Sequence, residues 1–147
     1  MVARDRCIMD MSYFNEDSNK GENESHLDSH ADTSACGSNM IVLDGTITDY
    51  VDVAPFSDEY TPIKDVPIGT CATAYDSAEN GETIILCFGE SLYFGNKLKQ
   101  SLLCPNQMRA CGNVVEDTPR QFDRRSKHGI SFRESAEERD FFVPLEL

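Results

Sequence analysis

Four side chains able to bind metals or transfer protons alternate along one short stretch of the sequence. They occupy every second position from 26 to 32, in the order His26, Asp28, His30 and Asp32. In an extended chain, such positions point to the same side. Imidazole and carboxylate groups can together bind a divalent metal, so one interpretation is a metal-dependent hydrolase that uses this cluster.

The histidine content weighs against that metal site. The chain has 3 histidines, and the third, His128, lies near Arg124, Arg125 and Lys127, whose positive charges disfavour a metal cation. The His-x-Asp-x-His spacing resembles that of metallo-β-lactamase-type hydrolases, which need further histidines from distant loops. We therefore expect neither a metal nor another cofactor, and the metal-dependent hydrolase stays as a second alternative.

The same stretch also matches the signature of a different class of hydrolase. Asp28-Ser29-His30-Ala31 is a variant of Asp-Ser/Thr-Gly-Ala, the aspartic peptidase signature, with His30 in place of the glycine. A second motif follows in the expected order, with Leu92-Tyr93-Phe94 ahead of Leu-Leu-Cys-Pro-Asn-Gln-Met at 102–108. Together the two motifs resemble the retropepsin-like protease segment of copia-type retrotransposon polyproteins, and the resemblance covers residues 26–112.

That resemblance implies an all-β fold, namely a retropepsin-like acid protease barrel with one short C-terminal helix and a site at a homodimer interface. Two copies of Asp28, one from each chain, would share one proton, because two like charges at close range cannot both ionise. One copy would activate a water molecule and the other would hydrogen-bond the peptide carbonyl. The implied function is an aspartic endopeptidase that processes a retrotransposon polyprotein.

The resemblance also assigns roles to other residues. Ser29 would join the two catalytic loops through hydrogen bonds between the chains. Residues 51–66 occupy the place of the retropepsin flap, although an ordinary surface loop with its aromatic side chains on the sheet is the alternative. The expected substrate-binding residues are His30, Ala31, Asp32, Phe56 and Tyr60, and the expected structural support of the site is Leu102 and Leu103.

His30 leaves the activity open. A glycine at this position lets the backbone pass close to the catalytic carboxylate, whereas an imidazole adds bulk and a titratable group. The ring could turn outward, could join the proton chemistry and shift the working pH, or could mark an inactive copy. The alternative to the peptidase is therefore a catalytically inactive, transposon-derived β module that dimerises or binds peptides.

Charge and length exclude further classes of function. The 147 residues include 26 acidic and 13 basic side chains, a net charge of −13, which disfavours binding to nucleic acid. No apolar run approaches the ~20 residues of a membrane span, and charged residues near Met1 argue against a secretion signal. We expect a soluble protein that is located in the cytoplasm or within virus-like particles there. We expect its six cysteines to be reduced thiols.

Local patterns predict the elements that position these residues. Short β-type runs cover 40–43, 50–53, 66–75 and 83–94. Asn80-Gly81 favours a hairpin turn between the last two runs, because such turns need positive φ angles. A short helix is expected to begin near Pro105 and to end before Gly112.

We expect three parts along the chain. Residues 1–25 form an acidic, polar and disordered leader, since the segment has too little apolar surface to fold. Residues 26–112 form the retropepsin-like domain. Residues 113–147 form a linker toward a pre-integrase region that is partly β, with a strand-like end at 141–145.

Overall fold

A computed structural model defines residues 24–54, 57–134 and 137–146. Within these residues the chain is mainly β, as expected, with one short helix. The strands are β1 (Ser25–Leu27), β2 (Ala35–Gly37), β3 (Ile41–Val42), β4 (Asp49–Val53), β5 (Ile63–Asp76), β6 (Thr83–Gly95), β7 (Ser101–Leu103), β8 (Val114–Glu116), β9 (Gly129–Glu134) and β10 (Arg139–Pro144), and the helix is α1 (Pro105–Ala110).

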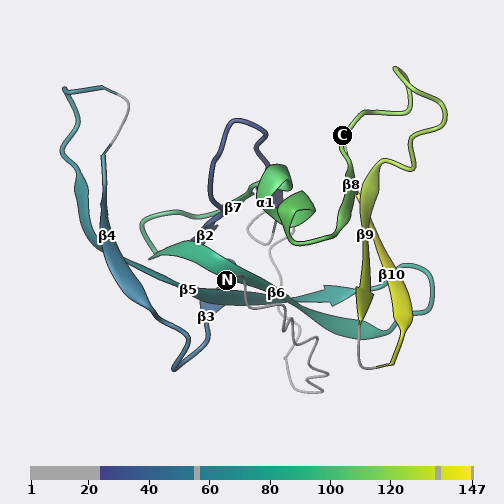
Figure 1. Ribbon diagram of the computed structural model, residues 1–147, viewed down its shortest axis with the longest axis horizontal. Coiled ribbons are helices and arrows are strands. Elements are labelled where there is room, and N and C mark those ends of the chain that lie inside the picture. The colour runs from purple at the N-terminus through teal and green to yellow at the C-terminus, as the bar shows by residue number, and fades with distance from the viewer. Residues whose placement is uncertain (1–23, 55–56, 135–136, 147) are drawn as a thin grey trace.

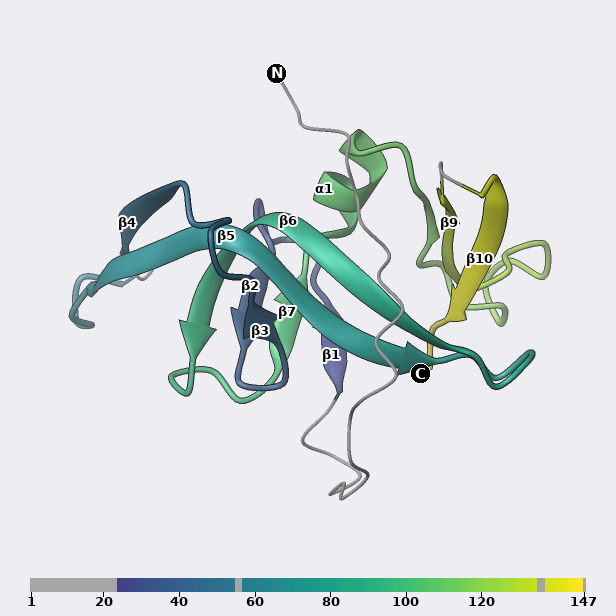
Figure 2. The ribbon, with the colours of Figure 1, turned by 90° about the horizontal axis from the view of Figure 1, so that it is seen from below.

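Most of the strands belong to one mixed sheet (Figure 1). Among the described residues its order is β1-β7-β2-β6-β5-β3, and β4 also pairs with β5. β1 is parallel to β7, and β2 is parallel to β6 but antiparallel to β7. Figure 2 shows β5 and β6 as a long twisted pair that crosses the whole molecule. The topology brings β1 beside β7, which directly precedes the helix.

The structure confirms the hairpin predicted around Asn80-Gly81, which joins β5 to β6. The two strands pair antiparallel up to Asp76 and Thr83, and the backbone amide of Ser77 donates to the carbonyl of Glu82 at 2.9 Å. Gly81 has a φ of 70°, a conformation that glycine adopts without a steric cost. The turn chemistry of the sequence therefore fixes this hairpin locally.

The loop predicted over residues 51–66 is shorter in the structure. β4 extends to Val53 and β5 begins at Ile63, so residues 54–62 connect the two strands. The pairing is irregular between Val51 and Val53, and Asp65 has a positive φ of 55° with its amide bound to the side chain of Asp52 at 3.1 Å. This bulge lets the strands continue into the segment predicted as loop, and we call β4, residues 54–62 and the start of β5 the arm.

The core lies where the main sheet meets α1. Its buried members are Cys36, Met40, Cys71, Leu103, Met108 and Val115. Cys36 and Cys71 are fully buried, and the hydrogen bond that the Cys71 thiol donates to Cys36, followed by burial, raises the pKa of Cys71. The cysteines that the structure describes carry free thiols. Cysteine serves in this core as a small apolar side chain.

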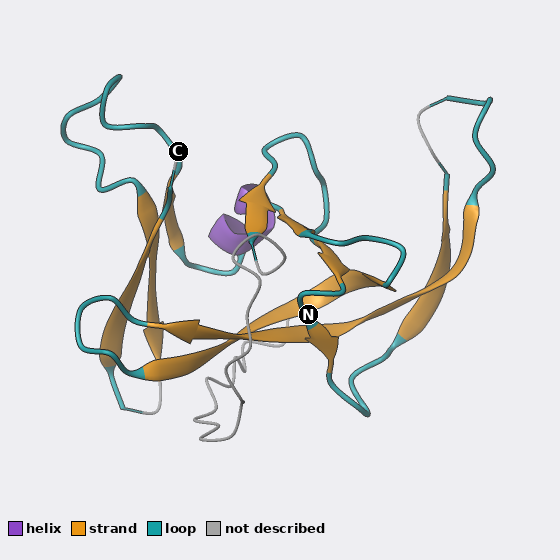
Figure 3. Cartoon of the chain, turned by 180° about the vertical axis from the view of Figure 1, so that it is seen from behind, coloured by secondary structure: helices purple, strands orange, loops and turns teal. Residues whose placement is uncertain are grey.

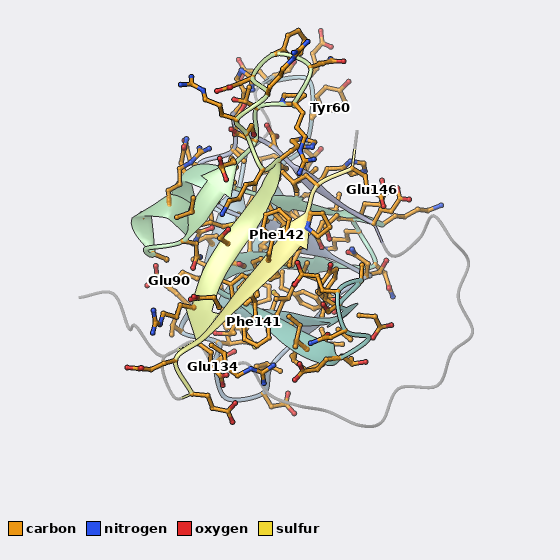
Figure 4. The ribbon with its side chains drawn as sticks, turned by 90° about the vertical axis from the view of Figure 1, so that its right-hand side faces the viewer. Tyr60, Glu90, Glu134, Phe141, Phe142 and Glu146 are labelled. Carbon is orange, nitrogen blue, oxygen red and sulfur yellow. The ribbon has the colours of Figure 1, made fainter. Side chains whose placement is uncertain are left out.

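A second sheet follows the helix, with the order β10-β9-β8 among the described residues. The rings of Phe132 and Phe141 stack across β9 and β10 with centroids 5.5 Å apart. Figure 4 views these two strands from outside, with Phe141 and Phe142 along β10. Val115 of β8 belongs to the core beside Met108, so this part of residues 113–147 packs against α1.

Candidate active site

Asp28 directly follows β1 and begins a tight turn. Its backbone amide donates to the carbonyl of Leu103 at 3.0 Å, and its carbonyl accepts from the amide of Ala31 at 3.2 Å. Its carboxylate Oδ1 accepts from the amide of His30 at 2.9 Å, the arrangement of an Asx turn. Although its backbone is held on both sides, the Asp28 side chain is 38% exposed. We call residues 28–34 the Asp28 loop.

The shared face proposed for the four alternating residues does not form. The backbone is extended over β1 and then turns after Asp28, so the period-two pattern ends there. His26 lies on β1, where its Nε2 is 3.0 Å from the side-chain oxygen of Gln100. Within the described parts of the chain, no cluster of three or more His, Cys, Asp or Glu side chains could hold a metal ion. The alternating spacing thus does not assemble a ligand set.

The backbone conformation at His30 does not require a glycine. The non-glycine residues with positive φ in the described ranges do not include His30, so a Cβ causes no strain at this position. The ring is 96% exposed and points away from the fold, with Nδ1 3.8 Å from Asp28 Oδ1 and 3.5 Å from Ser29 Oγ. Of the three expectations for His30, the outward ring matches this geometry.

Leu102 and Leu103 lie beside the Asp28 loop. On β7 they are the parallel partners of His26 and Leu27, and Leu103 is buried in the core. Leu103 also accepts the hydrogen bond from the Asp28 amide. An apolar strand therefore holds the base of the loop from the interior of the protein.

The end of the Asp28 loop is bound by two residues that the sequence analysis did not assign to the site. Cys104, the N-cap of α1, donates its amide hydrogen to Ser34 Oγ at 3.0 Å and its thiol to the carbonyl of Ala31 at 2.8 Å. The side-chain Oε1 of Gln107, in α1, accepts a hydrogen bond from the backbone amide of Ser34 at 2.9 Å. Both residues lie in the second of the two sequence motifs, at 102–108. The position of Cys104 directly before Pro105 is the sequence feature that indicates its role as a helix cap.

The arm projects from the same side of the main sheet as the Asp28 loop. Figure 1 shows this loop in purple above the sheet, with the arm rising beside it, and Figure 3 shows the same arrangement from behind, with α1 between the loop and the second sheet. Tyr60, in the loop of the arm, is 63% exposed. Phe56 lies outside the described residues. An exposed aromatic side chain is thus available near the tip.

A wide groove runs between the main sheet, α1 and the second sheet, with a volume of about 1580 Å³. Ser29 and Ser34 are among its polar lining residues, and Phe88, Met108 and Phe132 are among its apolar ones. Asp28 itself is not part of the lining. Two residues of the Asp28 loop therefore border the groove, whereas Asp28 does not.

Within the described ranges, no helix is long and apolar enough to cross a membrane. Comparison of the whole chain with protein-family models, with curated proteins and with solved structures finds no match.

Proposed function

We propose that this protein is a homodimeric aspartic endopeptidase of the retropepsin type that processes a polyprotein. One observation carries the proposal: the backbone of Asp28 is fixed to β7 through Leu103, while its side chain stays 38% exposed. A catalytic group needs a rigid support and an open reacting face. A carboxyl that must meet the same carboxyl of a second chain needs both.

The reaction would use Asp28 of each protomer. Two carboxyl groups in close contact share one proton, because the second ionisation is opposed by the first charge. The ionised copy would take a proton from water as the water attacks the peptide carbonyl carbon. The protonated copy would hydrogen-bond the carbonyl oxygen as it gains negative charge. The chain contains one Asp-Ser-x-Ala string, so the pair requires an isologous dimer.

The neighbouring residues would bind the peptide and join the subunits. Ser29 would hydrogen-bond across the dimer axis, and Ala31 and Asp32 would contact the peptide backbone. His30 lies at the exposed rim of the turn, where a substrate side chain could reach it. The arm, with Tyr60 and Phe56, would close over the substrate and exclude water. Water attack by a carboxyl pair needs no metal or other cofactor. The reaction belongs in the cytoplasm or in virus-like particles, without a membrane or nucleic acid partner.

The experiment is cleavage of a denatured protein mixture by the full chain at a series of pH values from about 4 to about 7, because the mechanism requires one carboxyl of the pair to be protonated and the other ionised. Asp28→Asn removes the ionisable group but keeps the shape of the side chain, so cleavage should be abolished. Asp44→Asn, an exposed carboxylate elsewhere, is the matched control. Inhibition by pepstatin is the supporting result.

Sedimentation of both variants shows whether the dimer survives. Cleavage that persists in Asp28→Asn would overturn the proposal. A stable dimer without cleavage at every pH would instead support the inactive, dimerising module. Loss of activity on chelation, with no effect of pepstatin, would also overturn the proposal.

A further inference from the structure

We propose that Gln107 is a positioning residue for Asp28, acting together with Cys104 through the Asp28 loop. The inference rests on the proposed peptidase function, which it deepens by naming residues that hold the catalytic group without contacting substrate. Gln107 and Cys104 both lie at the start of α1, three residues apart, and each binds the loop. The first turn of α1 and its N-cap therefore hold the Asp28 loop in place.

The side-chain amide of Gln107 joins two backbone segments. Its Oε1 accepts the amide hydrogen of Ser34 at 2.9 Å, and its Nε2 donates to the carbonyl of Glu90 at 3.0 Å. The two partners fix the orientation of the amide, since the Ser34 amide can only donate and the Glu90 carbonyl can only accept. A carboxylate lacks the donor, and a methionine lacks both groups. The contact pattern is therefore specific for glutamine at this length.

Ser34 is the fixed end of the loop. It is 2% exposed, its carbonyl accepts from the amide of Leu92 at 2.9 Å, and its Oγ accepts from the amide of Cys104. Loss of Gln107 would leave the Ser34 amide buried without a partner, which is unfavourable by more than the net value of one ordinary hydrogen bond. The loop would relieve this by moving.

The β6 partner of Gln107 is a residue with an uncommon backbone. Glu90 has a φ of 52°, in the left-handed region that non-glycine residues rarely occupy. Such conformations persist where surrounding contacts enforce them, and they cluster near functional sites. The hydrogen bond from Gln107 to the Glu90 carbonyl is one of these contacts. Gln107 thus couples a strained point of β6 to the Asp28 loop.

Cys104 holds the middle of the loop. Its fully buried thiol donates to the carbonyl of Ala31 and accepts from the amide of Gln107 at 3.3 Å. Ala31 in turn closes the turn that begins at Asp28. One sulfur atom therefore links the helix cap to the catalytic turn. Serine at this position would keep a donor and an acceptor, whereas alanine would remove both.

The test compares Gln107→Met with Gln121→Met, a matched change at an exposed position. The first readout is hydrogen exchange of the Ser34 amide, measured by NMR on the full chain. We expect exchange to be about tenfold faster or more in Gln107→Met and unchanged in Gln121→Met. Gln107→Glu keeps the acceptor for Ser34, so its Ser34 amide should stay closer to the original rate.

The second readout is the kinetics of peptide cleavage. A displaced catalytic group lowers kcat by about 10- to 100-fold while KM changes little, because ground-state binding of the peptide remains. Cys104→Ser should retain most of the kcat that Cys104→Ala loses. Circular dichroism and sedimentation confirm that each variant folds and dimerises.

The outcomes separate this inference from the function on which it rests. Unchanged Ser34 exchange in Gln107→Met overturns the inference whether or not the chain cleaves peptides. Faster exchange with unchanged kcat in an active enzyme also overturns it, because Gln107 would then be structural only. A chain that never cleaves peptides refutes the peptidase function, and with it the positioning role, whereas the exchange data still report the loop contact itself.

Discussion

The amide of Asp28 and the carbonyl of Leu103 form a 3.0 Å hydrogen bond that continues the parallel pairing of β1 and β7 past the end of β1. The bond joins the first strand of the described chain to the strand that leads into α1. Because Leu103 is buried, the position of the Asp28 backbone depends on the packing of the core. Stability and site geometry are therefore coupled through one residue.

Leu103→Ala should lower the free energy of unfolding by about 2–5 kcal/mol. The substitution removes apolar atoms from the buried core and leaves a cavity beside Met108 and Val115. Urea denaturation followed by circular dichroism measures the change. Val114→Ala is the control, since Val114 is 56% exposed and its loss should lower stability by less than about 1 kcal/mol. Equal effects of the two substitutions would show that Leu103 is not a core residue.

Gly129→Ala should destabilise the second sheet. A Cβ at this position would overlap the ring of Phe142 and lie 2.7 Å from the carbonyl oxygen of Val143, which as backbone cannot rotate away. Overpacking of this kind lowers stability by about 1–3 kcal/mol. Gly89→Ala is the matched control, because a Cβ there has nothing within 4 Å. Thermal unfolding of both variants tests the close contact, and a Tm for Gly129→Ala equal to that of Gly89→Ala would contradict it.

Local signals in the sequence predict the parts of the fold that form locally. Asn80-Gly81 marks the β5–β6 hairpin because the turn geometry needs residues that tolerate positive φ. Pro105 and Gly112 bracket α1 because a proline lacks an amide hydrogen that the first helical turn does not use, and Gly112 has the left-handed φ of 86° that follows a helix end. These features depend on a few adjacent residues.

Local sequence signals of this kind do not predict which distant strands pair with each other. Nothing in the residues near Ser25 specifies that β1 pairs in parallel with β7, since that choice is made by the packing of Leu27 and Leu103 in a shared core. The bonds from Gln107 to Ser34 and Glu90 likewise join segments that are distant in the chain. Spacing alone also misplaced His26 and His30 on one face, because it assumed an extended chain where the Asx turn forms.

Arg139 should control the ionisation of Glu82. Its guanidinium makes two hydrogen bonds to the Glu82 carboxylate, at 2.6 and 3.2 Å, and thereby holds the pKa of Glu82 below its ordinary value of 4.5. A lowered pKa in the folded state stabilises the protein above the unfolded-state pKa, and this stabilisation is lost as the pH falls through the folded-state value. Acidification should therefore weaken the contact between the β5–β6 turn and β10.

Arg139→Gln tests this assignment. The pKa of Glu82, followed by NMR titration of its carboxyl carbon, should return toward its ordinary value, and the loss of stability on acidification should become smaller. Arg133→Gln is the control, because Arg133 pairs only loosely with Glu138 and Asp140, at 3.7 and 3.9 Å. An unchanged Glu82 titration in Arg139→Gln would show that the ion pair does not persist in solution.

If the proposed peptidase function holds, His30→Gly should leave the pH profile of cleavage unchanged. The His30 ring is 96% exposed and 3.8 Å from the Asp28 carboxylate, and exposed ion pairs of this kind contribute about 0–1 kcal/mol, less at high salt. The turn itself should persist, because it uses the backbone amide of His30, which glycine also has. Cleavage rates measured across the pH range should thus give an optimum within about half a pH unit of the original. A larger shift, or an optimum that disappears in His30→Gly, would instead make the imidazole part of the proton chemistry and require its ring to turn toward Asp28 when substrate or the second chain is bound.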